Sequence, residues 1–428
     1  NLFKLLFSEI SVRKEKLVSV GVSSYASYIE AGYRDIPHIY LLIDNLTALI
    51  ELYLEDDDSL LNIIREGIAV GISVIVANSQ IMGIGYRYIS NFANKMSFHC
   101  NDNNEYTNIF EHPTLQPDDI AGRCVFEMDK CMLECQTYLA FGGMKEIERV
   151  RNMHEFIQKI NDKCADMKAK KIPCIPSVLT EESLINDFKA EADGYKLPVG
   201  LTYNEVEPFY LDLSRLGIMG LCGKENTGHN NFVQYVLEAL ESNREQYPVR
   251  VAIFDDASRK FGNFKDSEIV DVYSLNVEHI TQVVSSWYAV LSERYERLIA
   301  EGDIGGNTEL LLMIVQNNDI ARKIGGDFDL MEQFNEMISR YKGLNFAVIF
   351  TNYQNTSLSY DAPEPLQIIK QNQHLIFFQN LDELKVFEAP YEEIKANRRH
   401  LEVGDAYYIQ DNMFTKLKLV KARREDSQ

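Results

Sequence analysis

The sequence that decides the fold reads LGIMGLCG (216–223), KENTGHNN (224–231) and FVQYVLEAL (232–240). Its pattern is that of a buried strand, a loop bounded by glycines and an amphipathic helix. This order is typical of a P-loop, in which backbone N–H groups and a helix N-terminus bind phosphate. We therefore predict an α/β fold organised around this element.

The glycine spacing fits a P-loop, but the catalytic side chains do not. Gly223 and Gly228 stand where the motif G-x-x-x-x-G-K-[ST] has its two glycines. His229 replaces the lysine that reaches the β and γ phosphates, and Asn230 replaces the hydroxyl that binds magnesium. We predict that the loop binds ATP with little or no hydrolysis. The candidate nucleotide-binding residues are Gly223, Lys224, Glu225, Asn226, Thr227, Gly228, His229 and Asn230.

Three of these side chains also have simpler interpretations. His229 is either a phosphate contact or a histidine packed within the loop. Asn230 either meets a metal ion or caps the following helix. Lys224 is either solvated in a polar loop or supplies charge across a dimer interface. The sequence leaves these alternatives open.

Composition bounds the class of protein. The 428 residues are 46% hydrophobic and 11% aromatic, which is enough for two or three cores. The formal charge of −21 argues against a nucleic-acid partner, because phosphate contacts need a basic surface. Seven unpatterned cysteines indicate reduced thiols. The chain begins with Asn1 and has no apolar run of membrane-spanning length, so we expect it to be part of a longer protein, with any membrane anchor outside it.

A second candidate site lies in the first half of the chain. IYLLID (39–44) is a continuous apolar run, which predicts a central parallel strand buried on both faces. Asp44 ends this run, where a Walker B carboxylate would hold Mg²⁺. Asn45 follows in place of the usual glutamate, and it cannot accept a proton from water. The alternative is that Asp44 only caps the next helix.

The chain contains an internal repeat. Residues 2–21 match 283–302 in pattern, HIYLLIDNL (38–46) matches ELLLMIVQNN (309–318), and GISVIVANSQ (71–80) matches GLNFAVIFTNYQ (343–354). We predict two copies of one fold, the first of which starts partway through, so that its P-loop lies upstream. Gln316 is then the counterpart of Asp44. The second copy lacks the Walker lysine, the hydroxyl and the Walker B acid together, which argues against hydrolysis.

The copies set the expected domain boundaries. Residues 1–148 are predicted to be the C-terminal part of one module, 149–194 a linker rich in charge and proline, and 195–428 a complete module.

The residues also carry a family resemblance. LPVGL (197–201), EVEP (205–208) and LDL (211–213) precede the P-loop strand, while AGY (31–33) precedes PHIYLLIDN (37–45). These segments resemble the FtsK/SpoIIIE-like ATPases of type VII secretion, the EssC/EccC family, over nearly the whole chain. The resemblance implies two tandem RecA-like P-loop NTPase modules with mostly parallel central sheets, namely the end of the second module and the complete third.

The resemblance further implies a cellular role. The modules would lie at the cytoplasmic face of the cell membrane and dock small helical WXG-type secreted proteins through their C-terminal signal. Other modules of the same chain and further copies of it would be partners. One alternative is an active ATP-driven translocase of protein or DNA that needs oligomerisation. Another is a scaffold with empty pockets.

Overall fold

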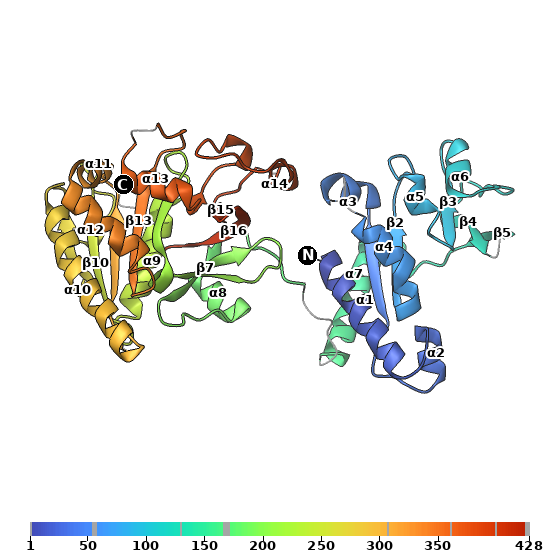
Figure 1. Cartoon of the computed structure of the whole chain (residues 1–428). Coiled ribbons are helices and arrows are strands. Elements are labelled where there is room, and N and C mark those ends of the chain that lie inside the picture. Colours follow the sequence, from blue (N-terminus) through green and yellow to red (C-terminus); the bar gives the residue numbers. More distant parts are fainter. Residues whose placement is uncertain are drawn as a thin grey trace. The chain divides into compact units, whose positions relative to one another are not determined.

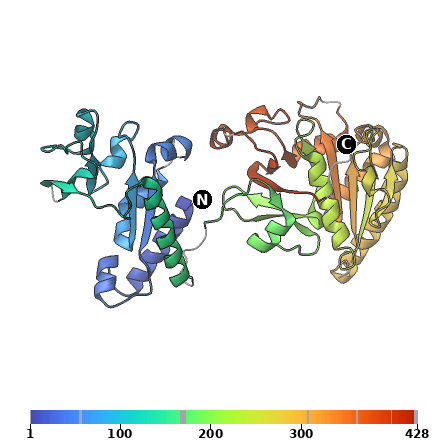
Figure 2. The same cartoon turned by 180° about the vertical axis from the view of Figure 1, so that it is seen from behind.

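The computed structural model divides into two units, Asn1–Ile172 and Pro173–Gln428 (Figures 1 and 2). It describes residues 2–53, 58–128, 131–165, 172–305, 308–359, 362–398 and 400–423. The boundary falls within 149–194, a stretch that also holds most of helix α7 (Glu146–Lys163) and helix α8 (Glu181–Phe188). Each unit is described by itself.

The second unit is built on one large mixed sheet. Six parallel strands run in the order β11-β10-β12-β13-β9-β14, and β15, β16, β7 and β8 extend the sheet with antiparallel pairs. The parallel strands are β9 (Gly217–Cys222), β10 (Val249–Phe254), β11 (Val270–Ser274), β12 (Leu310–Val315), β13 (Phe346–Tyr353) and β14 (Leu375–Phe377). The others are β6 (Leu179–Thr180), β7 (Lys196–Thr202), β8 (Pro208–Asp212), β15 (Asp405–Gln410) and β16 (Met413–Lys421).

Helices cover both faces of the parallel strands. Helix α9 (His229–Ser242) packs on one face, and it crosses in front of the sheet in Figure 2. Helices α10 (His279–Glu301), α11 (Asp319–Gly326), α12 (Phe328–Ser339) and α13 (Glu364–Gln371) pack on the other (Figure 1). All six side chains of β12 are consequently buried, as a continuous apolar run predicts. Short elements complete the unit: η2 (Leu213–Arg215), η3 (Gly262–Phe264), η4 (Leu381–Glu383) and α14 (Tyr391–Ala396).

The first unit contains two small sheets. Strands β1 (Ile39–Asp44) and β2 (Ile72–Ala77) are parallel, while β3 (Lys95–Phe98), β4 (Arg123–Met128) and β5 (Cys131–Gln136) are antiparallel. Its helices are α1 (Leu2–Ser19), α2 (Tyr25–Glu30), α3 (Leu46–Tyr53), α4 (Ser59–Gly67), α5 (Tyr86–Ile89), α6 (Asn104–Ile109) and α7, with η1 (Ile68–Val70) before β2. No helix in the described part of the chain is long and apolar enough to cross a membrane.

The prediction that the 39–44 strand is buried on both faces is wrong. Leu41 and Ile43 are buried in the core that α1 and α4 help to form. On the opposite face, Tyr40 is 63% exposed and Leu42 is 71% exposed. Ile75 of β2, which pairs with Leu42, is 53% exposed. The apolar run has the composition of a doubly covered strand, but this unit covers only one of its faces closely.

The internal repeat is visible in strand register. Leu42 pairs with Ile75 in the first unit, and Ile314 pairs with Ile349 at the matching positions of the second. The ends of the two strand pairs thus correspond residue for residue, with Asp44 matching Gln316.

A buried arginine is repeated as well. Arg13 Nη1 donates to the carbonyls of Val70 (3.1 Å) and Gly71 (3.3 Å). Arg294 Nη1 donates to the matching carbonyls of Leu344 (2.9 Å) and Asn345 (3.4 Å). In both copies the guanidinium thus fastens a long helix to the turn that enters the next strand.

Candidate nucleotide site

The P-loop of the second unit lies at the carboxyl end of the parallel strands, where open α/β sheets bind ligands. It connects β9 to α9, and β9 lies between β13 and β14. Gly228 has φ +124°, and a Cβ there would lie 3.3 Å from the Phe378 ring. The positive φ favours glycine at this position, and a larger side chain would also crowd the Phe378 ring.

His229 begins α9 and does not supply the missing positive charge. Its ring packs against the Phe378 ring, with centroids 4.5 Å apart. Its Nε2 is buried without a hydrogen-bond partner among the described residues. Burial lowers the pKa of His229 to about 4; the backbone of Cys222 opposes this shift and the charge of Lys260 adds to it. The imidazole is consequently neutral at pH 7.

The other loop residues lie as follows. Lys224 forms an ion pair with Glu383, with Nζ 2.6 Å from Oε2. Thr227 Oγ1 donates to the carbonyl of Lys224 at 2.7 Å, which closes the loop on itself. Glu225 and Asn226 are exposed, and Gly223 and Asn230 are partly exposed.

Helix capping does not explain the asparagines of this loop. The helix begins after Gly228, which acts as its N-cap. The Asn231 amide is used elsewhere: Nδ2 donates to the Val420 carbonyl at 2.8 Å and Oδ1 accepts from Ala422 N at 2.9 Å.

In the second unit, Gln316 occupies the position of the Walker B acid, and its side chain is already hydrogen-bonded. Gln316 is 2% exposed. Its Nε2 donates to Asp256 Oδ2 at 3.1 Å, and its Oε1 accepts a hydrogen bond from Thr351. Gln316 is an amide, so it cannot supply a carboxylate ligand for Mg²⁺.

The neighbouring strand ends in two aspartates that the sequence reading did not assign to the site. The Asp255 carboxylate, fully buried, accepts hydrogen bonds from Phe261 N (2.9 Å) and the Tyr273 hydroxyl (3.0 Å). Burial alone raises the pKa of Asp256, but hydrogen bonds from Ser258 and Gln316 outweigh it and lower the pKa. The sequence pattern that could have predicted them is the pair Asp255 and Asp256 directly after the apolar run VRVAIF (249–254).

Asp44 lies in the first unit, at the exposed carboxyl end of β1. Its neighbour Asn45, not Asp44, caps the next helix, because Asn45 Oδ1 accepts from Ala48 N at 3.1 Å. Asn78, at the end of β2, is tied to that helix by bonds with the backbone N–H (3.2 Å) and hydroxyl (3.0 Å) of Thr47. The Asp44 carboxylate forms no hydrogen bond or ion pair within the described residues, so it is free to take a ligand.

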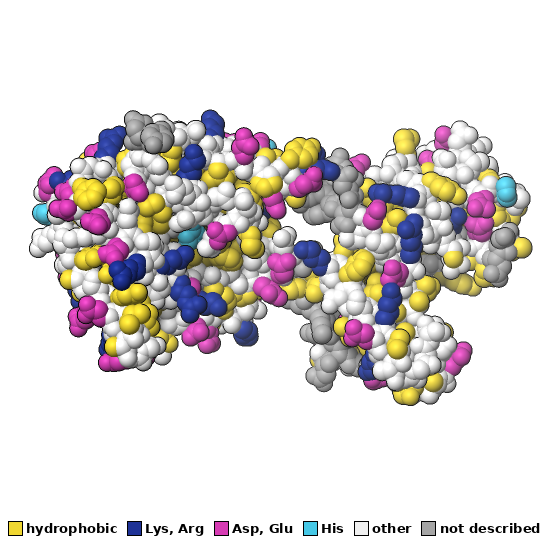
Figure 3. Space-filling view, viewed as in Figure 1, with side chains coloured by type: hydrophobic (Ala, Val, Ile, Leu, Met, Phe, Trp, Pro, Cys, Tyr) yellow, Lys and Arg dark blue, Asp and Glu magenta, His cyan; other side chains and the backbone are white. Residues whose placement is uncertain are grey.

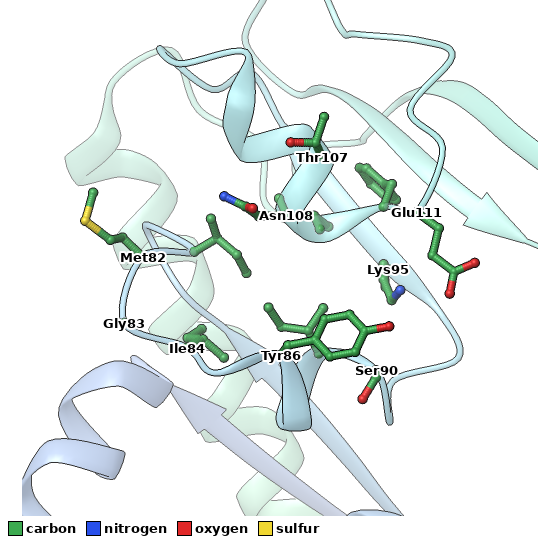
Figure 4. A pocket seen from close by; sticks show the side chains of 13 residues that line it. Met82, Gly83, Ile84, Tyr86, Ser90, Lys95, Thr107, Asn108 and Glu111 are labelled. Atoms are coloured by element: carbon green, nitrogen blue, oxygen red, sulfur yellow. The ribbon is translucent and has the colours of Figure 1, made fainter.

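Two hollows lie away from the P-loop. The first, of about 380 Å³, is in the first unit between the β2–β3 connection and α6 (Figure 4). Ile84, Tyr86 and Phe110 line it, with Lys95 and Glu111. The second, of about 400 Å³, lies at the amino end of β9, around Gly217 and His374. None of the predicted nucleotide-binding residues lines either hollow.

Charge on the molecular surface is mixed. Figure 3 shows Lys and Arg side chains interspersed with Asp and Glu side chains over the visible face of each unit. The face in view therefore does not present a field of a single sign.

The sequence of this chain is similar to that of a known secretion protein. No protein-family model matches the chain. It is 22% identical over 429 residues to the ESX secretion system protein YukB of Bacillus subtilis, covering 98% of this chain and 28% of YukB. The chain thus spans less than a third of that relative.

Two solved structures share its fold. EssC (ATPases 2 and 3) of Geobacillus thermodenitrificans has a TM-score of 0.73 and 21% identity, covering 98% of this chain and 78% of that one. Thermomonospora curvata EccC (ATPases 2 and 3), in complex with a signal sequence peptide, has a TM-score of 0.58 and 16% identity, covering 99% and 76%. This chain is therefore similar in sequence, over nearly its whole length, to a type VII (ESX) secretion protein, and similar in fold to ATPases 2 and 3 of EssC and EccC, which confirms the resemblance that its motifs indicate.

Proposed function

We propose that the second unit is a nucleotide-binding module that hydrolyses ATP slowly or not at all, and that it acts within a type VII secretion ATPase. One observation carries the proposal. The glycine-bounded loop keeps its backbone shape at Gly228, while a neutral His229 and a Gln316 hydrogen-bonded through both its amide nitrogen and its amide oxygen stand where lysine and a carboxylate belong.

The chemistry follows from charge. Phosphoryl transfer is catalysed mainly by positioning and by positive charge around the γ phosphate. Backbone N–H groups and the N-terminus of α9 can bind phosphate without those charges. Mg²⁺ would be held by the phosphates and water, since it keeps several waters in most protein sites. ATP thus serves the module as a structural or regulatory ligand.

We also propose that the module docks the C-terminal signal of small helical WXG-type proteins. The related EccC structure, which was solved with a signal sequence peptide, supports this role. Recognition would use an amphipathic helix with apolar anchors at i, i+3 and i+4. The longer protein would anchor the modules at the cytoplasmic face of the membrane, where other modules and further copies are partners.

Equilibrium binding of labelled ATP to the whole chain, with and without Mg²⁺, tests the nucleotide site alongside a turnover assay. We expect binding without turnover, and loss of binding in Gly228→Val. Gly302→Val is the matched control, because Gly302 also has positive φ (+77°) but lies at the end of α10 with nothing within 4 Å of a Cβ. Binding that survives Gly228→Val would place the nucleotide elsewhere and contradict the proposal.

The exposed, unpaired Asp44 favours one second candidate, an active translocase whose working Walker B acid lies in the first unit. If the longer protein hydrolyses ATP and Asp44→Ala abolishes that activity, the result would support the translocase. Hydrolysis that survives this substitution would contradict it.

A further inference from the structure

The lysine of the P-loop already has an anionic partner. Lys224 is the only lysine or arginine within residues 223–230, and its Nζ lies 2.6 Å from Glu383 Oε2. We propose that Glu383 is an internal competitor for nucleotide phosphate: it pairs with Lys224, and a phosphate group that binds Lys224 must displace it. This inference rests on the proposed nucleotide binding at residues 223–230.

The Glu383 carboxylate is positioned by its own partners. Gln379, which is 7% exposed, donates from Nε2 to the same Oε2 at 2.6 Å. Asn355 holds the backbone on both sides, since its Nδ2 donates to the Glu383 carbonyl (2.8 Å) and its Oδ1 accepts from Lys385 N (2.7 Å). Pairing with Lys224, with help from Gln379, also lowers the pKa of Glu383, so the carboxylate is charged at neutral pH. An acid fixed in this way presents its charge to the loop at little entropic cost.

The segment 378–385 contacts the loop at two points. At its start, the Phe378 ring packs on His229 and lies beside Gly228. Near its end, Glu383 pairs with Lys224. The aromatic contact involves no charge and need not change when phosphate arrives, whereas the ion pair must break. Nucleotide binding is therefore coupled to loss of the ion pair between Glu383 and Lys224, while Gln379 and Asn355 still hold Glu383 in place.

The strength of the competition follows from exposure. The Lys224 side chain is 67% exposed and that of Glu383 is 38% exposed. Ion pairs as exposed as this change an equilibrium severalfold at most, and salt screens them. Glu383 consequently weakens nucleotide binding without preventing it, and we expect its effect on the dissociation constant to be about two- to fivefold.

The experiment compares charge-matched variants of the whole chain, with labelled ATP as the probe. Glu383→Gln removes the charge and keeps the shape, and we expect it to tighten ATP binding about two- to fivefold at low ionic strength and less at high ionic strength. Asp382→Asn is the control, because Asp382 is the exposed neighbour and loses the same charge. Lys224→Gln should weaken binding, and Glu383→Gln should have no further effect in that background.

Each outcome decides a different point. Equal tightening by Glu383→Gln and Asp382→Asn would show an effect of net charge alone and overturn the competition. If the wild type binds ATP and Glu383→Gln binds it equally well, the competition is overturned but the nucleotide site is retained. Tightening by Glu383→Gln that Asp382→Asn does not reproduce would support the competition. Failure of every variant to bind would overturn both proposals.

Discussion

The two units share a skeleton and differ in the side chains at its functional edge. Strand register and the buried arginine are the same in both. The end of the matching strand, in contrast, carries an exposed Asp44 in one unit and, in the other, a buried Gln316 whose amide is hydrogen-bonded to Asp256 and Thr351. The difference shows that the groups holding this fold together are separate from those that would act on a nucleotide. If the second unit has lost its chemistry, as we propose, it has done so while keeping its architecture.

The largest expected contrast concerns Leu42 and Ile314, which occupy matching positions in the repeat. Ile314 is fully buried and Leu42 is 71% exposed. Ile314→Ala should lower the free energy of unfolding by about 2–5 kcal/mol. Leu42→Ala should change it by less than about 0.5 kcal/mol.

Two measurements suit this pair. The single tryptophan, Trp287, is buried in the second unit, so its fluorescence during urea unfolding reports on Ile314→Ala. Hydrogen exchange of the β1 amides reports on Leu42→Ala. Equal destabilisation by the two substitutions would mean that the exposed face of β1 is covered in solution.

The repeated arginine should matter equally in both units. Arg13→Met and Arg294→Met remove the arginine donor from the carbonyls of Val70 and Leu344, respectively. The second carbonyl of each pair keeps a backbone donor, from Ile39 N and Leu311 N. Arg294 also lies 3.7 Å from Glu309. We expect each substitution to cost about 1–3 kcal/mol, because a buried acceptor left without its donor is expensive. Faster hydrogen exchange in β2 or β13, respectively, would reveal the loss.

A control for the arginines lies on the same helix. Arg297 is exposed and pairs with Glu301, four residues along α10. Arg297→Met should cost less than about 0.5 kcal/mol. An equal cost would show that helix propensity or net charge, and not the buried contacts, sets the effect.

Acid should destabilise the second unit through its buried histidines. Burial lowers the pKa of His229 and of His374 to about 4, so both are neutral when folded. In the unfolded chain they bind protons near pH 6.5, and stability therefore falls as pH drops from about 6.5 to 4. Each histidine accounts for at most about 3 kcal/mol of this loss.

Trp287 fluorescence measures this dependence as urea midpoints across the pH range. His374→Gln should flatten the curve in this window, since glutamine takes up no proton. Asp and Glu titration affects the wild type and the variant alike, so their difference isolates the histidine. An unchanged slope would contradict burial of a neutral imidazole.

The smallest contrast is at the strand ends. Gln316→Asp would place a carboxylate beside Asp256, at a contact now 3.1 Å long, and we expect a cost of about 1–2 kcal/mol. Asp44→Asn alters an exposed group that has no hydrogen-bond partner among the described residues, and it should cost less than about 0.5 kcal/mol. Gln316→Asp should not gain ATP turnover, because the lysine is still missing. A measurable gain in a turnover assay would show that the acid alone limits this site.

Local pattern predicted much of this molecule. The strand, loop and helix around Gly223 appear where the sequence places them, and so do the strands that end at Asp44 and Val315. The repeat could be read because equivalent elements keep the same apolar periodicity. The exposed face of β1 could not be predicted from the sequence, since composition does not reveal which faces of a strand other elements cover. The pairing of Lys224 with Glu383 joins residues 159 positions apart, a contact that no local pattern encodes.

The exposed face of β1 and β2 has a consequence for handling the chain in solution. Tyr40, Leu42 and Ile75 form an apolar patch on a sheet of two strands. Apolar sheet faces and open strand edges are where separate chains adhere to one another. Light scattering by this 428-residue chain should rise with its concentration, and Leu42→Lys should reduce that rise. Binding assays are therefore best performed at low protein concentration, with dispersity checked at each step of the titration.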